Sequence, residues 1–256
     1  MFANRAYNRH GAVMLVCAGL VLGALAPARG EGPHQRRPAS LTSTQRAEYR
    51  IVQNDEEKGR ETIEKQVFNN NTVVFHIEAS MSYGPGVRMT QLIELLLEEE
   101  SYFPRTLHVS KTVEQPDGQS FEHLIDLEMI SNVAVVSSRI NNQEGSRRAV
   151  VPTGVSVFDV GVLGYFYQTL FWYDRATGGA QRYEWLDPIS VTISAGELKL
   201  EKEDTITVMG KKKKVSVYTI EREKLGAATL WVDEQGTIVR GEQNYFVYEL
   251  VSRKNS

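Results

Sequence analysis

Residues 72–81 read TVVFHIEASM, and this stretch decides the fold class because its apolar residues occupy alternate positions. Val73, Phe75 and Ile77 lie on one side of an extended chain, whereas polar residues such as Glu78 lie on the other. A period of two with one polar side is typical of an antiparallel sheet that has one face in solvent. The stretch therefore predicts a half-buried β-strand.

The same alternation continues along most of the chain, for example in residues 89–97 and 121–129. Residues 89–99 (MTQLIELLLEE) also have helix propensity, but their alternation and the turn residues Gly84-Pro85-Gly86 before them favour a strand. Turn residues separate the other runs in the same way. We count about six strands before residue 152 and about five after residue 188. The pattern predicts a mainly β protein with about eleven strands in a single curved antiparallel sheet.

One segment breaks the alternation. Residues 155–173 read VSVFDVGVLGYFYQTLFWY, and Ser156 followed three residues later by Asp159 resembles a capping box. This pattern predicts a helix over residues 157–173, ended by Gly178-Gly179. Such a helix is apolar on nearly every side, so it must be covered on several sides or line an apolar cavity. We expect the curved sheet to enclose it as a half-barrel.

Short motifs in this arrangement resemble a known superfamily. They are Tyr173-Asp174, Gly178-Gly179 and Leu186-Asp187, together with the closing stretch WVDEQGTIVR at residues 231–240. Over residues 46–252 the chain resembles the periplasmic half-barrel superfamily of the bacterial outer-membrane lipoprotein carriers, nearest to an uncharacterised branch. The resemblance implies a concavity that holds acyl chains between the sheet and its helix.

The N-terminal residues have the pattern of an export signal. Arg5 and Arg9 precede an apolar run from Ala12 to Ala26, and small residues follow it. This order predicts a signal peptide over residues 1–28, cleaved near Ala28, and therefore a periplasmic protein. A retained membrane anchor is the alternative, although the run is short for a span, which needs about 20 residues. Residues 29–45 are rich in Gly, Pro, Ser and Arg and predict a flexible linker before a single domain at 46–252.

Composition excludes several classes of protein. The formal net charge is −3, which gives no indication of nucleic-acid binding. Cys17 is the one cysteine and lies inside the predicted signal, so a disulfide framework and a cysteine-based zinc site are excluded. His76, His108 and His123 lie on separate predicted strands without the spacing of a helical metal pair. We expect no metal and no cofactor.

Motifs that carry catalysis are absent. The chain has no G-x-S-x-G elbow and no glycine-rich phosphate loop. Gly154-Val155-Ser156 distantly resembles an elbow, but a cap on the helix accounts better for Ser156. We therefore expect a protein that is not an enzyme.

Apolar side chains of the predicted helix and the strand after it are the candidate ligand-binding residues, because tyrosine and tryptophan suit a cavity with a wet mouth. They are Leu163, Phe166, Tyr167, Leu170, Phe171, Trp172, Tyr173 and Trp185. The sequence predicts a monomeric carrier or binding module for a lipid-like or other apolar ligand. The alternative is a structural or regulatory cell-envelope protein that docks a partner on its open sheet.

Four consecutive lysines form a second candidate contact. Lys211, Lys212, Lys213 and Lys214 follow Gly210 between two predicted strands, as in a solvated hairpin tip. A basic tip of this kind is attracted to anionic lipid headgroups, by about 1 kcal/mol per lysine near a charged surface.

Overall fold

The computed structural model describes residues 39–159, 161–223 and 226–256. In these ranges the chain forms one short helix and fifteen strands, which all belong to a single sheet. The elements are β1 (Leu41–Gln53), β2 (Glu56–Phe68), β3 (Thr72–Gly84), β4 (Val87–Glu98), β5 (Pro104–Glu114), β6 (Ser120–Ile130), β7 (Val133–Ile140), β8 (Gln143–Val150), β9 (Ser156–Val157), α1 (Phe166–Phe171), β10 (Ala180–Asp187), β11 (Thr192–Val208), β12 (Lys211–Arg222), β13 (Ala228–Asp233), β14 (Ile238–Gln243) and β15 (Phe246–Asn255).

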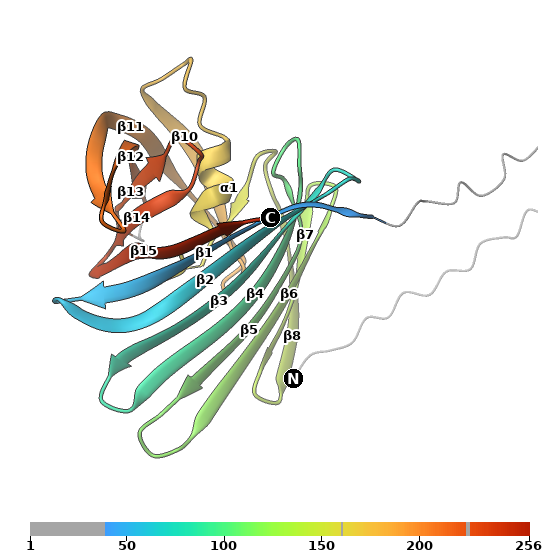
Figure 1. The fold of residues 1–256 in the computed structure, drawn as a ribbon. Helices are drawn as coiled ribbons and strands as arrows, with labels where there is room; N and C mark the ends of the chain where they lie inside the picture. Colours follow the sequence, from blue (N-terminus) through green and yellow to red (C-terminus); the bar gives the residue numbers. More distant parts are fainter. Residues whose placement is uncertain (1–38, 160, 224–225) are drawn as a thin grey trace, which may run out of the picture. The chain divides into compact units, whose positions relative to one another are not determined.

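The order of strands shows how the sheet curves and where it is open. The order is β8-β7-β6-β5-β4-β3-β2-β1-β15-β14-β13-β12-β11-β10-β9, so the first and last strands pair in the middle of the sheet. The two edge strands, β8 and β9, follow one another along the chain. In Figure 1 the long strands β1–β8 form a broad twisted sheet, while β10–β15 curl round beside α1. The fold is an open barrel whose gap lies between β8 and β9.

The predicted alternation is confirmed in the first half of the sheet. On β3, Val73, Phe75 and Ile77 are buried, whereas Glu78 is exposed. The disputed segment at 89–99 is a strand, β4, which pairs with both β3 and β5. Cross-strand pairing outweighs helix propensity here because it places Ile93, Leu95 and Leu97 together on the core face.

The predicted strand count and the predicted start of the sheet need correction. The sheet has fifteen strands rather than eleven, because eight strands rather than six precede residue 152 and both β9 and β10 precede residue 188. β1 begins at Leu41, so the last five residues of the predicted linker belong to a strand that pairs with β2. The predicted signal peptide and the first part of the linker lie outside the described residues.

The predicted helix over residues 157–173 is wrong in length, since α1 contains only six residues. Ser156 is not a cap, because it belongs to β9 and pairs with Trp185 of β10. Residues 161–165, just before α1, are not helical, and Gly161 has a φ of +88°. A right-handed helix cannot pass through that backbone conformation.

Candidate functional site

Residues 151–159 and 161–179, between β8 and β10, pack against part of the concave side of the barrel; we call them the insertion. Leu163, Phe166 and Trp185 were predicted to line a ligand cavity, but they are at most 1 % exposed. A Cβ on Gly241 of β14 would lie 2.4 Å from Leu163 Cδ1, so these two elements touch. The guanidinium of Arg222 lies over the ring of Phe166, 5.5 Å from its centre. Protein atoms therefore occupy the space in which the ligand was expected.

The remaining predicted ligand residues have mixed surroundings. Tyr167, Leu170 and Trp172 are partly buried against the core, and Tyr173 is buried. Phe171 is 47 % exposed and stacks on Tyr102, with 3.8 Å between the ring centres. Trp172 also borders a surface hollow of about 520 Å³ with Tyr183. The structure brings most of the eight residues together, as a packed cluster.

Tyrosine hydroxyls hold the insertion in place. The Tyr167 hydroxyl lies 3.0 Å from the Tyr49 hydroxyl, and it accepts a hydrogen bond from the backbone N–H of Ile238. The Tyr248 hydroxyl donates to the carbonyl of Gly161 at 3.0 Å. These bonds attach the insertion to β1, β14 and β15, where the first and last strands of the sheet pair.

Glu61 on β2 is a buried carboxylate that sequence reasoning missed. Its two oxygens accept hydrogen bonds from the backbone N–H groups of Leu163 and Gly164, at 3.0 and 2.9 Å. Burial raises the pKa of Glu61 to about 7, and the two N–H donors partly oppose this rise. The sequence did contain a signal for this burial. Glu61 lies on the same face of β2 as Ile63, and the opposite face of that strand is polar, so the carboxylate is expected to point toward the core.

A row of polar side chains crosses the inner face at the edge of the insertion. Gln91, Lys111 and His123 are consecutive cross-strand partners on β4, β5 and β6. Asp159 of the insertion lies over this row, since its Oδ2 accepts a hydrogen bond from Gln91 Nε2 at 2.9 Å. Lys111 Nζ lies 3.9 Å from the same oxygen. We call Gln91, Lys111, His123 and Asp159 the polar floor. It separates the part of the concave face against which the insertion packs from the part that the insertion leaves uncovered.

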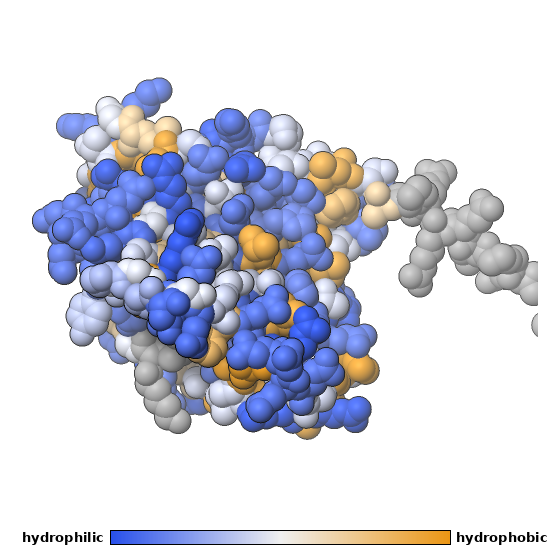
Figure 2. Space-filling view, turned by 90° about the horizontal axis from the view of Figure 1, so that it is seen from below, coloured by the Kyte–Doolittle hydropathy of each residue, from blue (hydrophilic) through white to orange (hydrophobic). Residues whose placement is uncertain are grey.

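Beyond that floor the inner face is open. Phe121 lies two residues before His123 on β6, Ile140 on β7 is the cross-strand partner of His123, and the two apolar residues are 44 % and 51 % exposed. On the next strand, nothing lies within 4 Å of the position where a Cβ on Gly145 would be. Figure 2 views the molecule from the end that carries the turns after β3, β5 and β7, and shows separate apolar patches among hydrophilic side chains. We call the inner surface formed by Phe121, Ile140 and Gly145 the open face.

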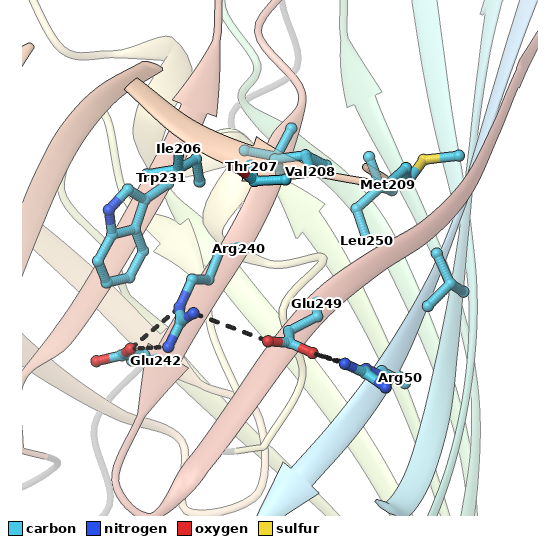
Figure 3. A pocket seen from close by; sticks show the side chains of 12 residues that line it. Arg50, Ile206, Thr207, Val208, Met209, Trp231, Arg240, Glu242, Glu249 and Leu250 are labelled. Atoms are coloured by element: carbon cyan, nitrogen blue, oxygen red, sulfur yellow. Dashed lines mark hydrogen bonds and ion pairs between the residues drawn. The ribbon is translucent and has the colours of Figure 1, made fainter. Parts of the chain in front are cut away.

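A second hollow, of about 610 Å³, lies on the outer side (Figure 3), where the end of β11 passes over β13–β15. Its charged groups neutralise one another. Arg240 Nη2 lies 2.7 Å from Glu242, and Glu249 lies between Arg240 and Arg50. The Arg240 guanidinium is also 5.3 Å from the ring centre of Trp231. Because these partners already satisfy the charges, the hollow offers a ligand fewer unused groups than the open face does.

The histidines His76 and His108 and the four lysines that the sequence analysis singled out do not line either of the two hollows described above. His76 and His108 are in register with Glu94, and His108 Nδ1 lies 2.7 Å from Asp126. In residues 39–159, 161–223 and 226–256 there is no group of three or more His, Cys, Asp or Glu side chains that could hold a metal ion. The four lysines begin β12, and Lys213 Nζ lies 3.4 Å from Asp233.

Comparisons with known proteins identify the fold and no activity. No family model matches the chain, and no curated protein matches it by sequence. A solved structure from Brucella abortus, described as a beta-barrel-like protein of Domain of Unknown Function DUF1849, has a TM-score of 0.61 and 13 % sequence identity. The match covers 83 % of this chain and 98 % of that one. This chain therefore has a β-barrel-like fold similar to that protein's.

Among the described residues, no helix has the length and apolar character needed to cross a bilayer.

Proposed function

We propose that this protein is a non-enzymatic binding module of the cell envelope that takes up one apolar chain on its open face. One observation carries the proposal: Phe121 and Ile140 are half exposed on the inner face, whereas apolar residues further along the same two strands and on the same face, such as Leu127 and Val136, are buried. Large apolar side chains that remain uncovered inside a concavity are typical of a ligand site. The barrel-like neighbour supports the fold and has no stated function.

The proposed position differs from the one expected from the sequence. The cluster around Phe166 is filled with protein atoms, so an apolar chain there would have to displace the insertion. On the open face, a chain would cover Phe121 and Ile140 and reach the empty space above Gly145. A chain of this kind gains up to about 0.8 kcal/mol per buried methylene before the costs of association. Ten buried methylenes would thus support micromolar affinity, which needs about 8 kcal/mol.

A pair of neighbouring substitutions on β8 tests the proposal. Gly145→Trp places a large ring over the open face, and we expect it to weaken the binding of myristate at least tenfold. Ser146→Trp is the matched control, because Ser146 is exposed and lies on the opposite side of the same strand. Titration calorimetry with purified protein measures both affinities. Equal affinities in the two variants would exclude the open face as the site.

A second function remains if no chain binds. β8 is an edge strand, pairs only with β7 among the described residues, and seven of its eight residues are exposed. An exposed edge can accept an extended segment of another protein as an added strand. If the wild-type protein shows no uptake of myristate, docking of a protein partner on this edge becomes the better proposal.

A further inference from the structure

The ammonium group of Lys111 on the inner face has one ion pair, with Asp159, at a distance of 3.9 Å. It lies beside the open face, because its cross-strand partner His123 is itself paired with Ile140. Its side chain is 21 % exposed. Lys111 Nζ makes no hydrogen bond to any residue that the structure describes, although an ammonium group has three donors. Partial burial without hydrogen bonds is costly for such a charge.

Asp159 compensates this charge only in part. The distance from Lys111 Nζ to Asp159 Oδ2 is 3.9 Å, which is beyond the usual range of about 2.7–3.2 Å for an N–H···O bond. Gln91 already holds the same oxygen at 2.9 Å, and Asp159 is 7 % exposed. The carboxylate is therefore fixed at the edge of the insertion. The ammonium group keeps its donors available for a further acceptor.

His123 does not compete with Lys111 for an anion. Partial burial, followed by the positive charge of Lys111, lowers the pKa of His123 below its usual value of about 6.5. The imidazole is therefore mainly neutral at pH 7, and Lys111 is the cation among the cross-strand partners Gln91, Lys111 and His123. Phe121 lies two residues before His123 on the same side of β6, so apolar surface adjoins the charge directly.

We propose that Lys111 binds the anionic head, a carboxylate or a phosphate, of a single-chain amphiphile whose tail lies on Phe121 and Ile140. This inference rests on the proposed function and adds the class of ligand. The head would complete the hydrogen bonds of the ammonium group, and the tail would cover the exposed apolar side chains. Charge-assisted hydrogen bonds that an ammonium group donates to an anion are stronger than neutral ones. The anionic head is therefore a source of selectivity over uncharged ligands.

The test compares two ligands that differ only in the charge of the head. Myristate and its methyl ester are titrated against the wild-type protein and against Lys111→Met, which keeps the length of the side chain and removes the charge. We expect the wild-type protein to bind myristate at least tenfold more tightly than the ester, and we expect Lys111→Met to lose this preference. Lys111→Arg should retain it. Lys199→Met, at an exposed lysine, is the control and should behave as the wild type does.

Each outcome separates the inference from the function on which it rests. If the wild-type protein binds the acid and the ester equally, the role of Lys111 is wrong while the binding module stands. If it binds neither, both proposals are wrong. The preference is the ratio of two affinities measured on the same variant. A general loss of stability in Lys111→Met would lower both affinities and leave their ratio unchanged. Dodecyl phosphate distinguishes the two heads: tighter binding than dodecanoate at equal chain length assigns a phosphate, and weaker binding assigns a carboxylate.

Discussion

Replacing Glu61 by glutamine should remove a component of the pH dependence of stability. Glu61 is fully buried, and its pKa of about 7 exceeds the ordinary value of 4.5 because burial disfavours the charged form. The folded state therefore binds a proton at pH values where the unfolded state has released it. The stabilisation from that proton is complete below pH 4.5 and is lost as the pH rises through 7.

The size of the effect follows from the two pKa values. The difference between 7 and 4.5 is about 2.5 pH units, and at about 1.4 kcal/mol per unit the loss is about 3 kcal/mol. Glutamine has nearly the same shape and no charge, and its carbonyl oxygen can still accept a hydrogen bond from Leu163 or Gly164. Glu61→Gln should therefore lose this component while retaining the fold.

Urea unfolding at a series of pH values from 5 to 8 measures the effect. We expect the free energy of unfolding of the wild-type protein to fall, relative to that of Glu61→Gln, by about 2–3 kcal/mol across this range, because part of the loss occurs below pH 5. The lowered pKa of His123 acts in the opposite direction, because its stabilising effect grows with pH, but it is common to both proteins. If the two proteins have parallel pH profiles, Glu61 is not the buried acid described above.

Three further predictions concern the insertion and the N-terminus. Phe166→Asp should cost several kcal/mol, because it places a charge where the side chain is fully buried; a normal thermal melt would contradict the packing. Gly164→Ala should lower stability by about 1–3 kcal/mol in urea unfolding, because its Cβ would lie 2.5 Å from Ile77 Cδ1; an unchanged midpoint would show that Ile77 moves freely. Intact-mass measurement of periplasmic protein should show cleavage near Ala28, and an intact Met1 would refute export.

Sequence periodicity was sufficient for the strands because it reports a local property. Alternate residues of a strand point to opposite faces, so the core face of β3 and the strand nature of β4 could be read without any partner. The five strands after residue 188 were also predicted in number, because turn residues mark their ends. A mainly β, curved antiparallel sheet follows from these patterns alone.

Distant partners decided the rest. Residues 161–165 form a loop rather than a helix, because Glu61, about one hundred residues away, accepts hydrogen bonds from the backbone N–H groups of Leu163 and Gly164. The pairing of β1 with β15, the gap between β8 and β9, and the approach of Asp159 to Gln91 and Lys111 likewise join residues that no local pattern connects. Hydrophobicity and turn residues thus determined which segments are strands. Only tertiary contacts determined which side chains are buried beside the insertion and which remain exposed on the open face.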